Sequence, residues 1–180
     1  MNILLHICCG PCGLYPLHIL REAGHAVTGF FYNHNIHPYQ EYTHRLAAAR
    51  DMAVQEVMPL LVRDDYDLEG FLSHVANKPH LRCSYCYASR LRATAAMAVE
   101  NGFDAFSASL LYSRYQRHDE IRIVGEQAGE EFGVRFHYED FRPGWQEGIR
   151  KSKAMGLYRQ QYCGCIYSEK ERYLPRKKES

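Results

Sequence analysis

The feature that most constrains this 180-residue chain is the placement of its seven cysteines, which fall into three short clusters far apart in the sequence. The clusters are Cys8, Cys9 and Cys12 in CCGPC, Cys83 and Cys86 in CSYC, and Cys163 and Cys165 in CGC. Thiols that serve only as small core hydrophobes would be scattered along the chain. We therefore expect the fold to gather all seven around one thiolate-bound metal centre, for which an iron–sulfur cluster is the best candidate.

Length and composition are those of an ordinary globular protein. The length fits one domain that is large enough to bury a core. Hydrophobic residues make up 46% of the chain and charged residues 24%, which is typical of globular domains. The formal net charge of +1 gives no argument for nucleic-acid binding, so any such argument must rest on local basic patches.

The amino-terminal sequence MNILLHICC has no charged leader, and its apolar run is too short for a signal peptide or a membrane span. We therefore expect a cytoplasmic protein with no membrane partner. In a reducing cytoplasm disulfides are rare, and clustered cysteines are typically metal-binding or catalytic.

Apolar runs typical of strands alternate along the chain with helical patterns. The predicted strands cover residues 2–7, 26–32, 57–62, 103–107 and 134–138. The predicted helices cover residues 14–23, 37–55, 68–76, 85–100, 118–132 and 145–155. This alternation predicts an α/β fold with a mostly parallel sheet of about five strands flanked by helices. We expect one domain over residues 1–168, followed by a basic, flexible tail over residues 169–180.

In parallel sheets of this kind, ligands bind beyond the carboxyl ends of the strands. CCGPC follows the first predicted strand, FYNHNIHP follows the second and DFR follows the fifth. At the start of the following helix, the backbone amides should lower the pKa of Cys12 and favour its thiolate. In CGC, we expect Gly164 to let the backbone approach a metal closely.

The clusters differ in how strongly each indicates a metal. CSYC puts two sulfurs on one side of a helical turn, a spacing that serves zinc, iron–sulfur and dithiol chemistry alike. CGC alone is a weak signal. Together the clusters offer seven soft ligands, more than the four that one tetrahedral zinc ion uses. Four thiolates would hold a [4Fe–4S] cluster and leave three.

Six segments, in order between residues 3 and 168, resemble those of the QueH-type epoxyqueuosine reductases. They are LLHICCGPC, FYNHNIHPYQEYTHR, RCSYCYASRL, SLLYS, DFRPGW and LYRQQYCGC. The resemblance implies a Rossmann-like fold of the PP-loop (HUP-like) kind, and a [4Fe–4S] cluster with a nearby mononuclear iron and no cobalamin. It implies two-electron deoxygenation of the epoxide of epoxyqueuosine at the wobble position of tRNA, which yields queuosine in the last step of its biosynthesis.

With these two centres, a hypothesis for the roles of the individual thiols follows. We expect Cys9, Cys83, Cys86 and one of Cys163 and Cys165 to hold the cluster. Cys8 and Cys12 would then hold the adjacent iron. Some members of the family carry an aspartate where this chain has Cys12, so sulfur would replace oxygen at that ligand position.

Opening an epoxide to an alkene also requires two protons. Among the groups on loops expected to face the site, His37 and Asp140 are the preferred donors, with His34 and Tyr32 as alternatives. The structural alternatives are that His37 shapes a helix start before Pro38 and that Asp140 pairs with Arg142.

Binding of tRNA needs basic and aromatic side chains for phosphates and unstacked bases. The predicted RNA-binding residues are Arg114, Arg117, Arg142, Tyr158 and Arg159. An external electron donor is also required, and the sequence does not identify it.

Two other readings remain open. One is a zinc or iron–sulfur protein whose thiolates brace an RNA-binding module. The other is an ATP-dependent PP-loop enzyme that modifies tRNA. The first strand–helix turn argues against this second alternative, because it lacks a series of phosphate-binding glycines.

Overall fold

The computed structural model describes residues 1–175 and contains one five-stranded sheet, ordered β3-β2-β1-β4-β5. The strands are β1 (Asn2–His6), β2 (Ala26–Phe31), β3 (Leu60–Val62), β4 (Ala105–Ala108) and β5 (Arg135–Phe136). All four neighbouring pairs are parallel. The predicted α/β fold is therefore confirmed, although β3 and β5 are shorter than their apolar runs indicated.

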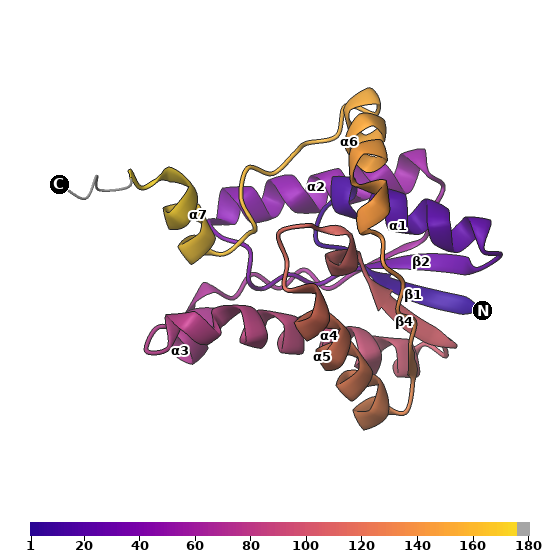
Figure 1. Ribbon diagram of the computed structural model, residues 1–180, viewed down its shortest axis with the longest axis horizontal. Helices are drawn as coiled ribbons and strands as arrows, with labels where there is room; N and C mark the ends of the chain where they lie inside the picture. The colour runs from indigo at the N-terminus through magenta and orange to yellow at the C-terminus, as the bar shows by residue number, and fades with distance from the viewer. Residues whose placement is uncertain (176–180) are drawn as a thin grey trace.

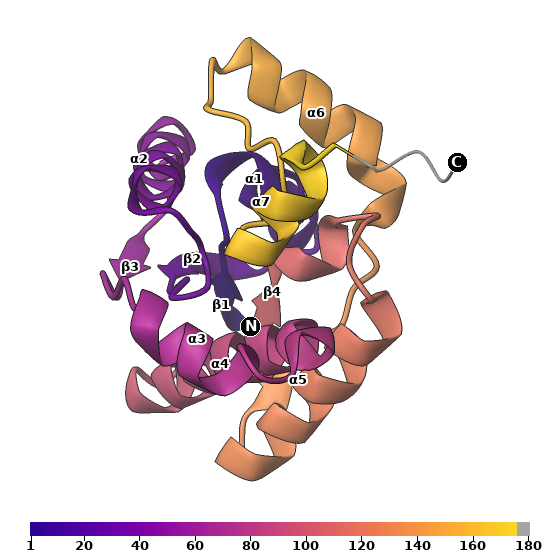
Figure 2. The same cartoon turned by 90° about the vertical axis from the view of Figure 1, so that its left-hand side faces the viewer.

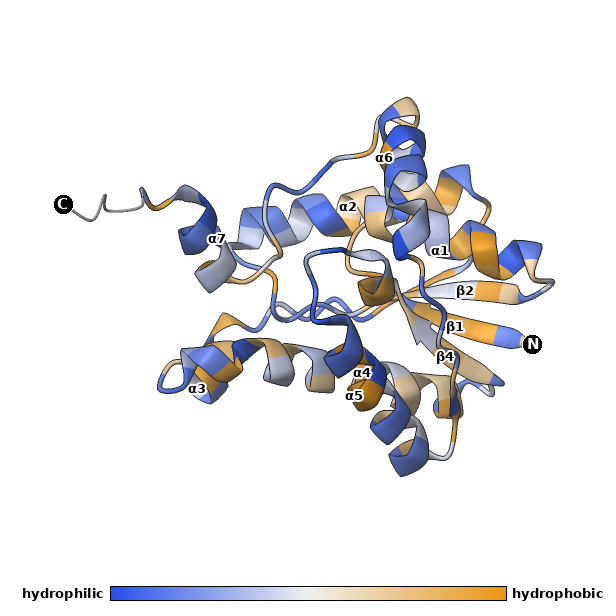
Figure 3. Ribbon diagram, viewed as in Figure 1, coloured by the Kyte–Doolittle hydropathy of each residue, from blue (hydrophilic) through white to orange (hydrophobic). Residues whose placement is uncertain are grey.

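Helices cover both faces of the sheet (Figures 1 and 2). One layer contains α1 (Gly10–Glu22), α2 (Tyr39–Gln55) and α6 (Trp145–Ala154), and the other contains α3 (Leu68–Val75), α4 (Arg82–Glu100) and α5 (His118–Phe132). Ile3, Leu4 and Leu5 of β1 are fully buried, as expected for a central strand covered on both faces. Figure 3 shows the apolar residues concentrated in the strands and the polar ones on outer helix surfaces. Within residues 1–175, no helix combines the length and apolarity needed to cross a bilayer.

The order of the strands reverses on either side of β1, which pairs with β2 and with β4. Such a switch point leaves a crevice at the carboxyl ends of the two strands. The first cysteine cluster follows β1, and the 3₁₀ helix η2 (Ser109–Tyr112) follows β4. The two segments touch there, since the Cys8 backbone N–H donates to Ser109 Oγ at 3.3 Å.

Two helices begin earlier than the sequence pattern indicated, and this places cysteines on their first turns. Helix α1 starts at Gly10, with Pro11 in its first turn, so that Cys12 is helical. Helix α4 starts at Arg82 and includes the whole CSYC segment. The difference at α1 follows from Pro11, because a proline fits the first turn of a helix as well as a loop.

Helix α7 (Ile166–Tyr173) was not predicted, and residues 169–173 of the expected flexible tail belong to it. None of its side chains is buried, so its sequence has no apolar stripe from which a helix could be predicted. It lies beyond the carboxyl ends of the strands (Figure 1). The last five residues of the expected tail, 176–180, lie outside the described part of the chain.

Gly10 is required by close packing of α1 on α2. A Cβ atom there would lie 2.3 Å from the backbone oxygen of Ala48 in α2. The glycine of CCGPC therefore serves contact between two helices, and this contact fixes the direction in which α1 leaves the thiols.

Candidate metal centre and adjoining cavity

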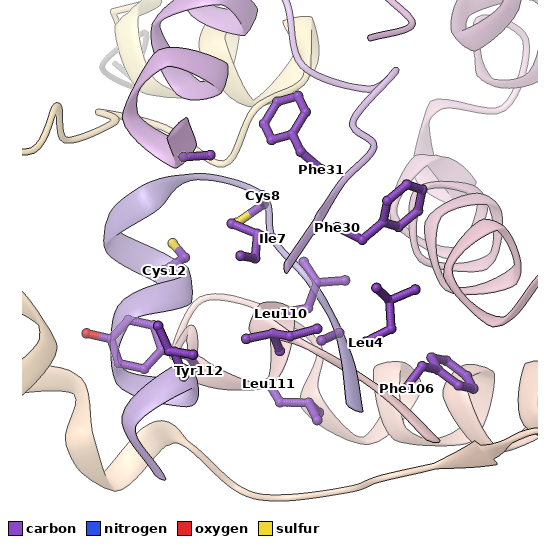
Figure 4. Packing of buried hydrophobic residues seen from close by; sticks show 14 of the residues in the cluster. Leu4, Ile7, Cys8, Cys12, Phe30, Phe31, Phe106, Leu110, Leu111 and Tyr112 are labelled. Atoms are coloured by element: carbon purple, nitrogen blue, oxygen red, sulfur yellow. The ribbon is translucent and has the colours of Figure 1, made fainter. Parts of the chain in front are cut away.

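The three sulfurs of the first cluster form a compact group at the end of β1. The Sγ atoms of Cys8, Cys9 and Cys12 all lie within 4.8 Å of one another, and those of Cys8 and Cys9 are 3.9 Å apart. All three residues are buried. Figure 4 shows Cys8 and Cys12 at the turn between β1 and α1, beside the apolar core. Three soft donors at this spacing can bind one metal ion.

The three thiols share their protons unequally. Hydrogen bonds from the sulfurs of Cys12 and Cys9 hold the pKa of Cys8 well below its usual range. The pKa of Cys9 is raised by burial, and the pKa of Cys12 is raised by its hydrogen bond with Cys8. The expectation that the pKa of Cys12 is lowered is therefore wrong, because the hydrogen bond with Cys8, together with burial, raises it. One thiolate forms readily, and further deprotonation requires a cation such as a metal.

The other four cysteines come together from two distant segments. Cys83 and Cys86 lie on the first turn of α4, and Cys163 and Cys165 lie just before α7. The charges of Cys163 and Cys165 act on both Cys83 and Cys86. Burial is the main reason why the pKa of Cys86 rises to about 12. Within residues 1–175, however, only the first cluster has three sulfurs close enough to ligate one ion.

The two cysteines of CGC face different surroundings. Cys163 is exposed, lines a cavity and accepts a hydrogen bond from Gln116 Nε2 at 3.1 Å. Cys165 is buried and packs with Phe71 and Val75 of α3.

The CGC loop is held by the segment that follows β2. Arg45 of α2 donates from Nη1 to the carbonyl of Cys163 at 2.7 Å and from Nη2 to that of Tyr162 at 2.8 Å. The His37 N–H donates to the Gly164 carbonyl at 2.8 Å. Gly164 has φ +155°, and a Cβ atom there would lie 3.3 Å from Ile36 Cγ1. The glycine thus permits close approach to this segment, and the predicted close approach of its backbone to a metal stays a prediction.

Besides Gln116, two more side chains that were not predicted as site residues donate hydrogen bonds to cysteine sulfurs. Arg90 Nη2 lies 2.8 Å from Cys86 Sγ, and Gln160 Nε2 lies 3.0 Å from Cys12 Sγ. Arg90 follows Cys86 by four residues on one helix, a spacing that puts both on one face. That spacing was therefore a usable signal for Arg90. Gln160 lies in an irregular segment, where no periodicity indicates which way its side chain points.

A cavity of about 530 Å³ adjoins the thiols. Its wall includes three cysteines, four aromatic residues and two arginines: Cys8, Cys12, Cys163, Tyr112, Tyr115, Trp145, Tyr162, Arg159 and Arg172. The rings of Tyr112 and Tyr115 lie 5.1 and 5.6 Å from that of Trp145. This volume is in the range of small-ligand sites. The cavity therefore joins sulfur, aromatic surface and positive charge in one place.

The two predicted proton donors lie outside that wall as far as the described residues show. His37 is fully buried against Phe71, with ring centroids 4.9 Å apart, and burial lowers its pKa to about 4. Neither of its ring nitrogens has a hydrogen-bond partner within residues 1–175. Asp140 pairs with Arg142 at 2.7 Å, and this hydrogen bonding lowers the pKa of the carboxyl to about 2. Both side chains are therefore deprotonated at neutral pH.

The predicted RNA-binding residues occupy different positions. Arg159 lines the cavity, and Arg114 acts electrostatically on the cavity residue Tyr112. By contrast, Arg117 pairs with Glu120 at 3.3 Å. Arg142 forms an ion pair with Asp140, and the Tyr158 hydroxyl donates a hydrogen bond to the Glu41 carboxylate.

Comparison with known families gives a match over almost the entire chain. The family model described as "Epoxyqueuosine reductase QueH" matches residues 3–171. A relative of that name from Dehalococcoides mccartyi is 39% identical over 172 residues, which cover 96% of this chain and 94% of the relative. Another from Thermotoga maritima is 36% identical over 182 residues, covering 95% of this chain and 92% of the relative.

Among solved structures, a similar fold occurs in a predicted subunit of a tRNA methyltransferase from Methanocaldococcus jannaschii. The TM-score is 0.58 at 13% sequence identity, with 85% of this chain and 74% of the other covered. This likeness supports the fold assignment alone.

Proposed function

The chain belongs to the QueH family of epoxyqueuosine reductases and is an oxidoreductase of queuosine biosynthesis, and we propose how its thiols and cavity carry out the reaction. The reaction breaks both C–O bonds of the epoxide and forms a C=C bond. The oxygen leaves as water, which takes up two protons while the carbon skeleton gains two electrons. The observation that carries the proposal is the convergence of Cys8, Cys12 and Cys163 on one cavity wall.

The donor set fits an iron centre, because thiolates are the ligands that iron–sulfur clusters use. We assign the [4Fe–4S] cluster to Cys9, Cys83, Cys86 and one of Cys163 and Cys165. Cys8 and Cys12 would hold a second iron. Burial supports this division, since Cys8 and Cys12 line the cavity whereas Cys9 is fully buried. When bound, these centres supply single electrons and a Lewis acid for the epoxide oxygen.

The cavity wall supplies binding groups for the modified nucleoside. Tyr115 is 85% exposed and stands edge-on to Trp145, so its ring is free to stack on a base that leaves the anticodon loop. Arg159 on the wall and Arg114 nearby would contact phosphates. We propose that the enzyme meets its tRNA substrate in the cytoplasm, where an external one-electron carrier would reduce it.

His37 and Asp140 stay our candidates for delivering the two protons. Because both are deprotonated at neutral pH, each would have to relay a proton from solvent. Asparagine keeps the shape of the Asp140 side chain, and at position 37 it replaces the imidazole with a smaller amide; either replacement removes the capacity to relay a proton. A reductase activity reduced by a factor of about 100 or more would support a relay role, and unchanged activity would remove that residue from the mechanism.

The decisive experiment combines anaerobic iron and sulfide analysis with turnover of tRNA that contains epoxyqueuosine, followed by mass spectrometry of the nucleosides. We expect a brown protein that converts epoxyqueuosine to queuosine when a chemical reductant is supplied. A colourless zinc protein without turnover would favour the reading as a structural thiolate–metal module. Turnover that required ATP would favour the PP-loop reading.

A further inference from the structure

Among the arginines within residues 1–175, two are almost completely buried, and only one of these two has a carboxylate partner. The relative exposure of Arg45 is 1% and that of Arg90 is 2%. Arg45 Nε lies 2.6 Å from Glu41 Oε1, so its charge is balanced. No carboxylate within residues 1–175 lies within 4.0 Å of the Arg90 guanidinium. Its partners are Cys86 Sγ at 2.8 Å, the Cys86 carbonyl at 3.1 Å and Asn33 Oδ1 at 3.5 Å.

A cation that is removed from water requires a nearby anion, because neutral dipoles replace only part of its hydration. The ionisable groups that act on Arg90 are dominated by cysteines, with Cys86 in contact and Cys8 and Cys163 farther off. The missing negative charge must therefore come from thiolate sulfur. Arg90 lies between the first cysteine cluster and CSYC, where a centre held by both would supply that charge.

The surrounding residues fix the guanidinium in this position. Arg90 and Cys86 are one helical turn apart on α4, and the Nε–H bond to the Cys86 carbonyl aligns the side chain along the helix. On the other side, Asn33 is itself anchored by its bond to the Ile7 carbonyl at 2.9 Å. The planar guanidinium of Arg90 thus donates to Cys86 Sγ, the Cys86 carbonyl and Asn33 Oδ1 at once. A lysine ammonium cannot reproduce all three contacts.

We propose that Arg90 is the internal counter-ion of the thiolate-bound centre and raises its reduction potential. The inference rests on the proposed function, since it requires a reducible centre at these thiols. A one-electron reduction takes an electron from a donor such as dithionite and adds one negative charge to the centre, with no proton moved. A fixed cation in a water-poor site stabilises the more negative state, and a hydrogen bond to a ligand sulfur acts in the same direction. Arg90 is in this sense a positioning residue that acts through Cys86.

The test is an anaerobic spectroscopic redox titration of the iron-loaded protein and three variants. Arg90→Gln removes the charge and keeps hydrogen-bonding capacity, and Arg90→Lys keeps the charge. The matched control is Arg92→Gln on the same helix, where the side chain is 54% exposed and pairs with Glu131. We expect Arg90→Gln to lower the equilibrium constant for one-electron reduction by at least tenfold, which is a shift of about 59 mV to lower potential. Arg90→Lys should recover most of the shift, and Arg92→Gln should leave the potential unchanged.

Two results would overturn the inference while the proposed function stands. One is an Arg90→Gln variant with full iron and sulfide content and the wild-type potential. The other is an Arg90→Lys variant shifted as far as Arg90→Gln, since charge would then not be the cause. If the Arg90→Gln variant takes up no iron, iron uptake becomes the measurement, and the Arg90→Lys variant must then take up iron. If neither variant takes up iron, Arg90 has a structural role and the inference is overturned. A wild-type protein without a reducible centre would overturn the inference and the proposed cofactor together.

Discussion

Within CCGPC, neighbouring sulfurs face different parts of the molecule. Cys8 and Cys12 line the cavity, and Cys9 is turned into the core with no exposed surface. Cys8 and Cys9 lie in the turn between β1 and α1, and their different exposure places them well to serve two different centres. This difference leads to a test of the proposed division of ligands.

Cys9→Ala should abolish the visible absorption of the iron–sulfur cluster, whereas Cys12→Ala should keep that absorption and lose about one iron per chain. The reason is that Cys9 is assigned to the cluster and Cys12 to the second metal. Iron and acid-labile sulfide per chain, measured after anaerobic reconstitution, check the prediction. Loss of sulfide in both variants to the same extent would mean that the first cysteine cluster holds a single shared centre.

The ion pair between Asp140 and Arg142 predicts a pH-dependent contribution to stability. The folded-state pKa of Asp140 is about 2 against 3.8 for the free side chain. Because the pKa is lowered on folding, the stabilisation is fully present above about pH 4 and is lost as the pH falls toward 2. Both side chains are more than a third exposed, so the contribution is discounted to about 1 kcal/mol or less. Asp140→Asn should therefore show the same deficit in urea unfolding at pH 7 and pH 5, and a smaller one at pH 3. A deficit that grows on acidification would contradict this assignment.

At the scale of elements, the loop that carries Cys163 depends on helix α2. Arg45 binds the carbonyls of Tyr162 and Cys163 and is paired with the buried Glu41. Arg45→Ala would leave the Glu41 carboxylate buried without its cation. We expect this to destabilise the metal-free protein by about 3–5 kcal/mol in urea unfolding.

The matched variant is the double replacement Arg45→Met with Glu41→Leu, which removes both charges. It should be less destabilised than Arg45→Ala, because no uncompensated charge remains. Iron uptake by the double variant then reports separately on the CGC loop. A double variant as unstable as the single one would show that the carbonyl contacts, and not the ion pair, dominate.

The contact between α1 and α2 controls where the first cysteine cluster lies. Gly10→Ala would bring a methyl group to within 2.3 Å of a backbone oxygen of α2, which cannot rotate away. We expect a loss of about 1–3 kcal/mol from overpacking, together with weaker metal uptake. Gly13→Ala is the control, because its nearest neighbour is the flexible end of Met52 at 3.1 Å. Thermal unfolding of both variants checks the difference, and equal melting temperatures would contradict the packing argument.

The sequence predicted the elements with strong periodic patterns and missed those that depend on tertiary contact. The buried run of β1 and the alternation of strands and helices were sufficient for a parallel sheet. Helix α7 carries no buried face and could not be recognised by an apolar stripe. Clustering identified the thiols as a set, and the four-residue spacing from Cys86 was a usable signal for Arg90. The anchor at Arg45, by contrast, is found only when α2 is placed beside the CGC loop. These contacts of Arg45 have no signature in a linear pattern, because the carbonyls of Tyr162 and Cys163 lie far from it in the sequence.

At the scale of the whole molecule, the near-zero net charge of +1 means that RNA affinity must depend on where the positive charge lies. Arg159 lines the cavity at the carboxyl ends of the strands. Arg135 is exposed and begins β5, at the opposite end of the sheet beside Met1. Charge reversal at either position changes the net charge by the same amount, so the pair separates a local contact from a global effect.

We expect Arg159→Glu to weaken binding of tRNA by about tenfold or more and to lower the slope of log affinity against log salt by about one, as for the loss of one phosphate contact. Arg135→Glu should leave the slope unchanged and weaken binding only slightly. Filter binding or anisotropy across a salt series, with metal-free protein to exclude effects on the iron centre, measures both quantities. Equal losses of affinity for the two variants would mean that tRNA binding responds to net charge alone. That result would contradict the proposal that the nucleoside enters the cavity.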